Sequence, residues 1–581
     1  MSASMSAKPY EGIAASPGIA IARAVKLESD AYTPEKVAVD QPQREQERFR
    51  AAVEEARDQI ETLRMSTEQK LGAAKAEIFE GHLMLLEDPE LIDAVHETIG
   101  ADSVNAEFAL YEVFQSFIDM LSELEDETLR ERAADIRDIR SRILNLLRGV
   151  PGNDLTQLQE ECIIIAHDLT PSDTAQLNLE LVRGFVTVIG SRTSHSAIMA
   201  RSLDVPAIVG AGEDLSEIAA GDLLVMDASE GKLWVNPGAE LLEQFREQKA
   251  AYDKRRAELA AWVKEPSLTK DGHRVELAAN IGKLEDVQKA LDNGAEGIGL
   301  FRTEFLYMGR THLPSEEEQF QSYKYVLEKL EGKPVVIRTL DIGGDKELPY
   351  LELPKESNPF LGQRALRLCL ERDGLFRTQL RALLRASRFG NLKIMFPMIA
   401  VREELLEAKR MLEEERQALL QEGVELAESI EIGMMIEVPA AAIAADSLAP
   451  DVDFFSIGTN DLIQYTMAAD RMNETVSYLY QPVHPSILRL IGMVIDAARR
   501  EGKWVGLCGE MAGDLAAVPL LLGLGLHEFS MSAGSILQTR ELIGSLSHAE
   551  WQQHARHAMT LRGQHEVQAF VQEQQGKRRE R

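Results

Sequence analysis

The sequence predicts a multidomain α/β protein whose larger, C-terminal part is a (β/α)8 TIM barrel, and three observations support this fold class. The chain has 581 residues, too many for one hydrophobic core, so two to four domains are expected. Residues from about 34 to 148 carry apolar side chains at helical spacing. Residues from about 270 to 545 alternate short apolar runs with helical stretches, which is typical of repeated βα units.

A short strand-like segment around Ser16-Pro-Gly opens the chain, and a zone of antiparallel helices follows it. Apolar side chains recur there three and four residues apart, as a/d-type patterning requires. The sets are Phe49, Val53, Ala56, Ile60 and Leu63; Leu110, Phe114, Phe117, Leu121 and Leu124; and Ile136, Ile139, Ile143 and Leu146. The segment from His82 to Leu86 is unusually apolar; buried packing is favoured for it over a docking surface.

The next zone, from about 150 to 236, alternates strands and helices. Strands are expected at 162–166, 184–189, 207–209 and 223–226. The charged run from Glu240 to Lys264 predicts a linker helix.

The strongest fold signal lies in eight apolar runs separated by helical stretches. The runs are 275–279, 297–301, 334–338, 392–397, 430–437, 452–457, 504–508 and 528–532. Barrel enzymes carry their chemistry at the carboxyl ends of the strands. Polar residues fall at or just after the ends of these runs: Arg302, Arg338, Glu437, Asn460, Asp461 and Cys508. A doubly wound open sheet is the alternative, but it explains this placement less simply.

The composition of the chain limits which kinds of partner and which cellular compartment are expected. The formal net charge of −32 argues against nucleic acid, and solvated helix faces explain the acid surplus as well as a basic protein partner does. The cysteines Cys162, Cys369 and Cys508 fit neither a disulfide framework nor a zinc site, which indicates a reducing compartment. The first residues lack an apolar signal core, and the longest apolar run is too short to span a bilayer. We expect a cytoplasmic protein without membrane insertion.

His195 lies where an apolar run meets a Gly/Ser/Thr turn and a helical pattern begins, in Gly190-Ser-Arg-Thr-Ser-His195. Free backbone N–H groups and the helix dipole at such a turn favour an anion, so a histidine there could carry a phosphoryl group. A helix N-cap turn with an incidental surface histidine is the simpler interpretation of this residue alone.

Two carboxylates, Glu437 and Asp461, are expected on adjacent strand ends with the amide of Asn460 beside them. Such a set suits a hard octahedral cation such as Mg2+, which keeps its remaining positions for water and substrate oxygens. A salt bridge at the barrel rim is the alternative for each carboxylate.

Arg302, Arg338 and Arg471 are expected on the same rim. Planar guanidinium groups match carboxylate and phosphate oxygens, so three of them beside a dication imply a small, highly anionic substrate. One such arginine usually has a structural role, but a purely structural role is harder to maintain for three arginines on the active face.

Cys508 follows an apolar run and precedes a glycine, without a metal or disulfide partner, which makes it a candidate acid or nucleophile. No Walker-type G-x-x-x-x-G-K-[ST] motif is present, so we do not expect ATP as the phosphoryl donor.

These blocks resemble the enzyme I family of the bacterial phosphoenolpyruvate-dependent sugar phosphotransferase system, the phosphoenolpyruvate–protein phosphotransferases. The resemblance runs from Gly12 to about residue 540. It includes Gly12-Ile-Ala-Ala-Ser-Pro-Gly-Ile-Ala20, Phe79-Glu-Gly-His-Leu-Met-Leu-Leu-Glu87, Glu131-Arg-Ala-Ala-Asp-Ile-Arg-Asp138, Asp168-Leu-Thr-Pro-Ser-Asp-Thr-Ala-Gln-Leu177, the His195 segment, Asp341-Ile-Gly-Gly-Asp-Lys-Glu-Leu-Pro-Tyr350 and Asp453-Phe-Phe-Ser-Ile-Gly-Thr-Asn-Asp-Leu462.

The resemblance implies a swivelling α/β phosphohistidine domain, an inserted helical-hairpin domain and a barrel that works as a homodimer. His195 would be the phosphohistidine nucleophile, oriented by Thr174, and Cys508 would protonate the enolate to give pyruvate. The small carrier protein HPr would then accept the phosphoryl group while docked near His82 to Leu86. Phosphoenolpyruvate would bind Arg302, Arg338, Asn460, Asp461 and Arg471, and Mg2+ would bind Glu437 and Asp461.

The resemblance also implies a division of the chain. We expect the phosphohistidine domain in 1–33 and 149–236, the carrier-binding helical domain in 34–148, a linker helix in 237–264, the phosphoenolpyruvate-binding and dimerisation barrel in 265–545, and a C-terminal helix with a polar tail in 546–581. The alternatives are a dikinase or phosphoenolpyruvate-synthase-like enzyme, which needs an added ATP-binding domain, and a non-catalytic regulatory homologue, which is expected to have lost the site residues.

Overall fold

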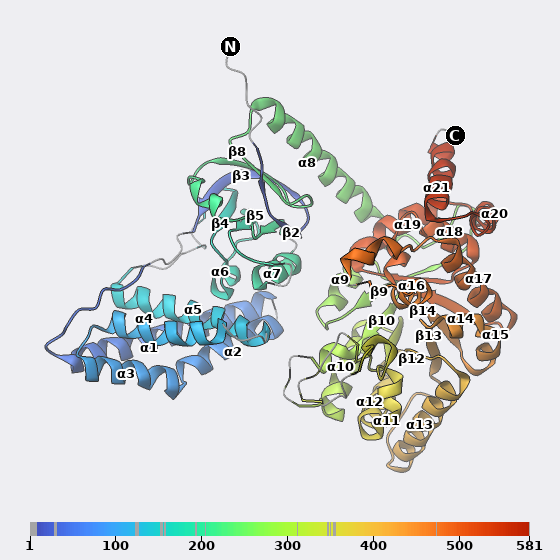
Figure 1. The fold of residues 1–581 in the computed structure, drawn as a ribbon, viewed down its shortest axis with the longest axis horizontal. Helices are drawn as coiled ribbons and strands as arrows, with labels where there is room; N and C mark the ends of the chain where they lie inside the picture. Colours follow the sequence, from blue (N-terminus) through green and yellow to red (C-terminus); the bar gives the residue numbers. More distant parts are fainter. Residues whose placement is uncertain are drawn as a thin grey trace. The chain divides into compact units, whose positions relative to one another are not determined.

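All eight apolar runs of the second half are strands, and they close into a parallel barrel in the computed structural model (Figure 1). Each strand pairs with the next along the chain, and β16 pairs back with β9. The strands are β9 (Glu276–Ile281), β10 (Ile298–Arg302), β11 (Pro334–Arg338), β12 (Asn391–Phe396), β13 (Glu431–Ile436), β14 (Phe454–Ile457), β15 (Trp504–Leu507) and β16 (Glu528–Met531). The predicted (β/α)8 barrel is confirmed, and the open-sheet alternative is wrong.

The structure describes the chain apart from residues 1–7, 28–31, 72, 123–126, 151–154, 156–157, 192–193, 204, 309, 311, 345–347, 349, 352–355, 472 and 580–581. The chain divides into two units, Met1–Arg255 and Arg256–Arg581.

The barrel has two hydrophobic layers because successive strand residues face opposite sides of the sheet. Ile337 of β11 belongs to the large core between the strands and the helices, whereas its neighbour Val336 belongs to a small core inside the barrel. The interior core comprises Leu300, Val336, Met395, Met435, Phe454 and Cys508. Burying one such Val, Leu or Ile side chain contributes about 1.5–3 kcal/mol, so each strand is stabilised on both faces.

Helices surround the barrel strands and follow them in sequence. They are α9 (Asp286–Asp292), α10 (Glu316–Lys329), α11 (Leu366–Glu371), α12 (Asp373–Ala386), α13 (Arg402–Gln421), α14 (Pro439–Ile443), α15 (Ala445–Leu448), α16 (Thr459–Met467), α17 (Pro485–Arg500), α18 (Val518–Leu524), α19 (Ile536–Ser545), α20 (His548–Ala558) and α21 (Gln564–Arg579). The start of α10 shows how local sequence sets a boundary. Ser315 and Glu318 form a reciprocal capping box there, which satisfies two backbone N–H groups.

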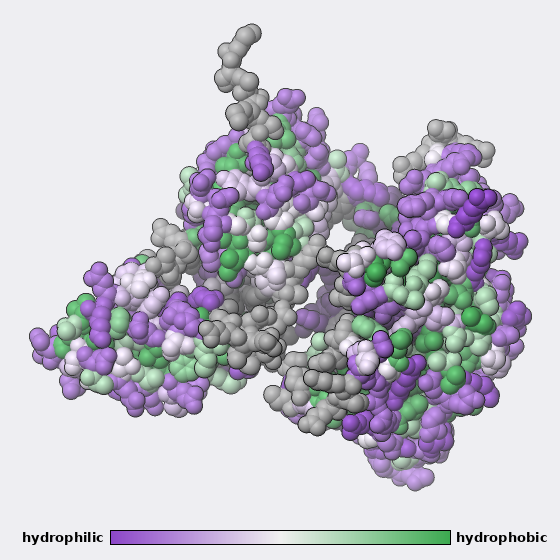
Figure 2. Space-filling model, in the orientation of Figure 1, coloured by the Kyte–Doolittle hydropathy of each residue, from purple (hydrophilic) through white to green (hydrophobic). Residues whose placement is uncertain are grey.

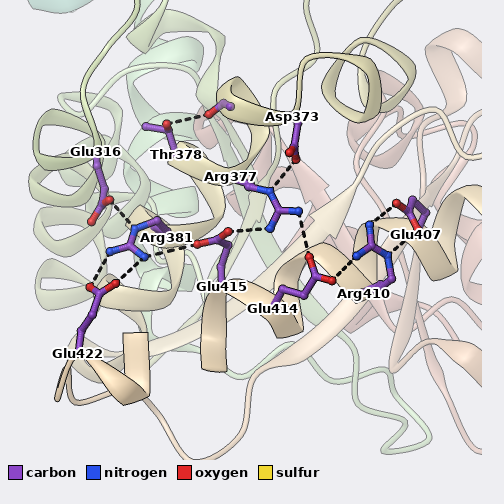
Figure 3. Close-up of polar contacts among 11 residues, drawn as sticks. Glu316, Asp373, Arg377, Thr378, Arg381, Glu407, Arg410, Glu414, Glu415 and Glu422 are labelled. Carbon is purple, nitrogen blue, oxygen red and sulfur yellow. Dashed lines mark hydrogen bonds and ion pairs between the residues drawn. The ribbon is translucent and has the colours of Figure 1, made fainter. Parts of the chain in front are cut away.

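An ion-pair network joins the outer faces of α10, α12 and α13 (Figure 3). Arg377 and Arg381 of α12 each contact three carboxylates, and they share Glu415 of α13. Glu414 pairs with both Arg377 and Arg410. An exposed pair alone contributes about 0–1 kcal/mol, but shared partners spread the ordering cost over several contacts.

The first unit contains an eight-stranded mixed sheet with the strand order β1-β8-β7-β3-β4-β5-β6-β2. Its strands are β1 (Tyr10–Glu11), β2 (Ile13–Ser16), β3 (Ile19–Lys26), β4 (Cys162–Ala166), β5 (Val182–Thr187), β6 (Ala207–Val209), β7 (Leu223–Asp227) and β8 (Lys232–Val235). Its helices are α6 (Pro171–Ala175), α7 (His195–Leu203) and α8 (Ala239–Ala260). The predicted strand at 184–189 begins and ends two residues earlier.

Five helices are inserted between the neighbouring strands β3 and β4. They are α1 (Pro42–Leu71), α2 (Ala73–Leu86), α3 (Pro89–Asp102), α4 (Ala106–Ser122) and α5 (Glu127–Arg148). Their apolar faces form a core of their own, which includes Phe49, Ile60 and Phe114. The segment from His82 to Leu86 has two faces: His82 is 1% exposed, whereas Met84 is 67% exposed.

Hydrophilic residues cover most of the visible surface in Figure 2, as the strongly negative charge leads one to expect. Within the described part of the chain, no helix has the length and apolar content needed to cross a membrane. All three cysteines are buried and free.

Candidate active site

The candidate barrel site begins with an ion-paired arginine at the end of β11. Arg338 is buried, and its guanidinium contacts Glu304, which follows β10. Its Nη1 lies 2.9 Å from Asp341 Oδ2, while its Nε has no hydrogen-bond partner among the described groups. A buried N–H without a partner is costly, so this donor is well placed for an anionic ligand.

Asp341 links Arg338 to a second buried arginine, Arg364. Arg364 Nη2 lies 3.0 Å and 3.2 Å from the two oxygens of Asp341, which is a bidentate contact. Arg364 Nη1 lies 3.5 Å from Asp461 Oδ1. This arginine therefore holds two carboxylates that follow different strands.

Glu437 and Asp461 are both buried in this charged cluster. Glu437 Oε2 accepts a hydrogen bond of 2.8 Å from the Met398 N–H, and its Oε1 lies 3.9 Å from Arg338 Nη1. The pKa of Glu437 is raised to about 7, first by burial and then by the negative charges of Asp461 and Asp341. Crowded carboxylates of this kind are stabilised by a cation. In the described part of the chain, no group of three or more His, Cys, Asp or Glu side chains is arranged to hold a metal ion.

Asn460 lies at the start of α16, directly before Asp461. Its Oδ1 accepts hydrogen bonds from the Tyr480 hydroxyl at 3.1 Å and from the Glu510 N–H at 3.3 Å. The carbonyl oxygen is thus committed to the protein, whereas the Nδ2 group makes no hydrogen bond to a described group and can donate to a ligand.

Arg302 and Arg471 differ from the two buried arginines. No described carboxylate lies within ion-pair distance of either guanidinium, whereas Arg338 and Arg364 are each paired. Arg302 is exposed at the end of β10, yet surrounding protein and the charge of Arg338 lower its pKa. Arg471 is half-buried in the turn after α16. Burial and the charge of Glu510 raise the pKa of Tyr480 to about 12, and the charge of Arg471 opposes that rise. These two positive charges can neutralise an anionic ligand.

Cys508 follows β15 and belongs to the core inside the barrel. Burial raises the pKa of its thiol to about 11, so the sulfur keeps its proton at neutral pH. Its backbone carbonyl accepts a 2.9 Å hydrogen bond from Asn280 Nδ2, which fixes the residue at the strand end. A buried neutral thiol can donate a proton, and it is a poor nucleophile. Of the two roles the sequence leaves open, the structure favours the acid.

The second candidate site lies in the first unit, at the beginning of α7. His195 is the first residue of this helix, and its side chain lies outside the described residues. Ser194 Oγ accepts a hydrogen bond of 3.4 Å from the Ala197 N–H and donates one of 2.9 Å to the Ser191 carbonyl, so it caps the helix. The expected helix N-terminus is present, whereas Arg192 and Thr193 of the expected turn lie outside the described residues.

Two further residues surround the beginning of α7. Burial raises the pKa of the Asp168 carboxyl, against the opposing effects of the Leu169 N–H and the Ser196 hydroxyl. Thr174 is buried in α6, which packs beside α7. Asp138 of α5 lies at the N-terminus of α6. Its Oδ2 accepts a 3.3 Å hydrogen bond from the Ser172 N–H. The helical insertion therefore contacts α6, which packs beside the helix that His195 begins.

The barrel brings Arg302, Arg338, Glu437, Asn460, Asp461 and Cys508 to the carboxyl ends of its strands. Arg471 lies farther along the chain, after α16, and Thr174 and His195 lie in the other unit. Sequence reasoning missed Arg364 and Glu304. Arg364 precedes α11 in a polar loop, where no apolar run marks a strand end. Glu304 was discoverable, because it follows Arg302 by two residues.

Comparisons with known proteins agree with this organisation. Three phosphoenolpyruvate-utilising families match the chain: "PEP-utilising enzyme, N-terminal" over residues 11–132, "PEP-utilising enzyme, mobile domain" over 158–231 and "PEP-utilising enzyme, PEP-binding domain" over 256–548.

Close relatives match almost the whole chain. The phosphoenolpyruvate-protein phosphotransferase of Bacillus sp. (strain S) is 58% identical over 97% of this chain and 98% of its own length. That of Priestia megaterium is 57% identical over the same shares, and that of Bacillus subtilis (strain 168) is 56% identical over 97% of this chain and 99% of its own length. The chain therefore belongs to the phosphoenolpyruvate–protein phosphotransferase family, enzyme I of the phosphotransferase system.

Proposed function

We propose that the protein moves the phosphoryl group of phosphoenolpyruvate to His195, releases pyruvate, and passes the group to a histidine of the carrier protein HPr, as the first step of sugar uptake by the phosphotransferase system. The observation that carries this proposal is the charge arrangement of the barrel mouth. Two guanidinium groups without a carboxylate partner among the described residues, Arg302 and Arg471, accompany a buried pair of carboxylates. That combination suits a small, highly charged anion bound together with a cation.

The proposed roles follow from the donors that each residue keeps. Arg302, Arg471, the Nε group of Arg338 and the amide of Asn460 hold the phosphate and carboxylate oxygens of phosphoenolpyruvate. Asp461, paired with Arg364, adds an acceptor beside them. Phosphoryl transfer needs positioning and charge neutralisation more than covalent help, which such a set provides.

Glu437 and Asp461 are the proposed Mg2+ ligands, and their chemistry fits that ion. Hard carboxylate oxygens are the ligands Mg2+ prefers. Burial raises the pKa of Glu437 most, and the charges of Asp461 and Asp341 raise it further; a bound dication would offset that repulsion. Bound there, the ion would neutralise phosphoryl oxygens of the substrate.

Cys508 is the proposed acid. As the P–O bond breaks and the P–N bond to His195 forms, the leaving group is the enolate of pyruvate. Its methylene carbon takes the thiol proton of Cys508, and pyruvate results. The thiol holds that proton at neutral pH because burial raises its pKa to about 11.

The two-site arrangement implies that the phosphohistidine domain swivels between the barrel and HPr, gated by the segment around α8. We propose that HPr docks on the helical insertion near His82 to Leu86. Met84 there, Met65 on α1 and Met120 on α4 are large exposed apolar side chains, and methionine adapts to a partner surface. The domain division expected from the sequence, a homodimer through the barrel and a cytoplasmic location complete the proposal.

The decisive experiment is incubation of the intact protein with phosphoenolpyruvate and Mg2+, followed by mass spectrometry of the modified peptide. We expect one acid-labile, base-stable phosphoryl group on His195, its absence in His195→Ala, and its retention in the control His167→Ala. Labelling by ATP instead would support the dikinase class. No labelling by either donor would support a regulatory homologue.

Docking of HPr has a separate test. Met84→Asp is expected to slow transfer from the phosphorylated protein to HPr, and to leave labelling of His195 by phosphoenolpyruvate unchanged. Unchanged transfer to HPr would refute docking at this segment.

A further inference from the structure

One buried glutamine outside the candidate site contacts two of its strand ends. Gln379 lies on α12 and is 1% exposed. Its Oε1 accepts a 2.9 Å hydrogen bond from the Leu340 N–H, just after β11. Its Nε2 donates to Thr303 Oγ1 at 3.2 Å, just after β10. A single side-chain amide thus joins the ends of two neighbouring strands.

Thr303 extends this connection to the backbone of the site. Its hydroxyl donates a 3.0 Å hydrogen bond to the carbonyl of Arg338, the last residue of β11. Thr303 itself lies directly between Arg302 and Glu304 in sequence. A chain of hydrogen bonds therefore runs from the Gln379 amide through the Thr303 hydroxyl to the Arg338 carbonyl.

A second set of buried polar groups continues the network beyond the glutamine. Gln379 Nε2 also donates to the Tyr323 hydroxyl at 3.1 Å, and that hydroxyl donates to Gln319 Oε1 at 3.1 Å. The Tyr307 hydroxyl donates to the same oxygen at 3.0 Å. Gln319 Nε2 donates to the Pro314 carbonyl, at the start of α10. The amide of Gln379 has one orientation because its own three partners, Leu340, Thr303 and Tyr323, use both of its ends.

We propose that Gln379 is a positioning residue that sets the separation of the Arg302 and Arg338 guanidinium groups for the phosphate and carboxylate of phosphoenolpyruvate. The inference rests on the proposed function. The two arginines end neighbouring strands, and their Cα positions are paired in the barrel. Gln379 ties the segments directly after them, and it contacts neither guanidinium. Misplacement of ligand-binding groups by about 1 Å can cost up to 100-fold in rate, so a remote tie of this kind is significant for binding.

The network itself identifies the substitutions that test this role. Gln379→Leu keeps the approximate volume and removes both the acceptor for Leu340 and the donor to Thr303. Thr303→Val keeps the shape and removes only the hydroxyl between Gln379 and Arg338. Gln319→Leu is the matched control, because it is equally buried in the same network and lies away from the strand ends.

The measurements separate the two half-reactions of the intact protein. We expect Gln379→Leu and Thr303→Val to raise the KM for phosphoenolpyruvate about tenfold with a smaller change in kcat. Transfer from phosphorylated His195 to HPr, which does not use the barrel, is expected to keep the wild-type rate. Gln319→Leu is expected to lower the melting temperature at least as much and to leave that KM within about twofold. The double variant should show less than the product of the single effects, because both substitutions break one connection.

Each possible result either supports or overturns the proposed role of Gln379. An unchanged KM in either folded variant would overturn the proposal, and so would an equal rise in Gln319→Leu, which would reveal general loosening of the barrel. If Gln379→Leu does not fold, Thr303→Val alone carries the test. Failure of the wild-type protein to be labelled by phosphoenolpyruvate would refute the proposed function instead, so the two failures are distinguishable.

Discussion

Arg364 Nη2 lies 3.0 Å from Asp341 Oδ1, and both side chains are 2% exposed. The same guanidinium reaches Asp461, a proposed ligand of the cation, while the same carboxylate reaches Arg338. A buried pair of this kind orients the charges on both sides of it. Removal of one partner is costly because the other stays charged and buried.

Arg364→Met is therefore expected to destabilise the barrel by about 3–5 kcal/mol, since it leaves Asp341 and Asp461 without their shared cation. Arg364→Lys keeps the charge but loses the bidentate contact, so it should lower the rate of His195 labelling about 100-fold at a smaller cost in stability. Thermal unfolding and labelling by phosphoenolpyruvate measure the two effects. Arg388→Lys, in an exposed pair with Glu425, is the control and should change neither.

Cys508→Ala should slow pyruvate release by about 100- to 10,000-fold, the range of a general acid, and still allow phosphorylation of His195. Because the thiol pKa is raised to about 11, the wild-type rate of pyruvate formation should show no alkaline loss from this group between pH 7 and about 9.5. A loss centred near pH 8.5, the value of an ordinary thiol, would contradict the burial argument. Cys162→Ala serves as the matched control for a buried cysteine in the other unit.

Because its carboxyl is buried, Glu528 is expected to make the free energy of unfolding of the barrel depend on pH. Its side chain and that of Glu276 start on paired strand positions, and each has a buried Oε1 without a hydrogen-bond partner among the described groups. Burial and the charges of Glu276 and Glu431 raise the pKa of Glu528 to about 8, against the opposing charge of Lys393. The folded protein thus keeps a proton that the unfolded chain releases above about pH 4.5. Stability from this group is complete below that pH and falls as pH rises through about 8.

Glu528→Gln removes this titration and offers an amide to Glu276. We expect the variant to melt roughly 3 °C above the wild type at pH 9, with a smaller difference at pH 5. Glu425→Gln, an exposed carboxyl, should show no such pH dependence. A wild-type barrel whose melting temperature rises from pH 5 to 9 relative to Glu528→Gln would contradict the assignment.

Substitution of Arg381 tests how much the ion-pair network of Figure 3 contributes to stability. Its guanidinium contacts Glu316, Glu415 and Glu422, so it connects α10 to α13 through α12. Arg381→Met should destabilise the barrel by about 1 kcal/mol in dilute buffer, and the difference should shrink in 1 M salt because exposed charges are screened. Denaturant unfolding at both salt concentrations measures this. A difference that is independent of salt would indicate lost packing of the side-chain stem instead.

The barrel was predictable because its strands are covered on both faces. Such strands read as continuous apolar runs, and the run at 334–338 coincides with β11. β5 shows the limit of this approach. This strand begins at Val182, but Arg183 and Gly184 interrupt the apolar pattern. The expected strand therefore starts two residues after the observed one. The short edge strand β1 carried no detectable pattern.

Site residues at strand ends were predictable for the same reason, since an apolar run followed by a polar residue marks the position. Arg364 and Gln379 act through contacts between segments far apart in sequence. Arg364 meets Asp461, and Gln379 meets Thr303. Nothing in the local spacing of either residue distinguishes it from an ordinary loop arginine or helix glutamine, so only the folded barrel reveals them.

The pairing of β16 with β9 affects the order in which this protein can be completed during synthesis. The edge of β9 that faces β16 has to wait for residues 528–531 to leave the ribosome, after nearly the whole chain has been translated. Until then the nascent barrel presents two open strand edges, on β9 and β15, to other growing chains. A premature stop before Glu528 would leave those edges permanently unpaired, so the truncated products should aggregate rather than accumulate as soluble fragments.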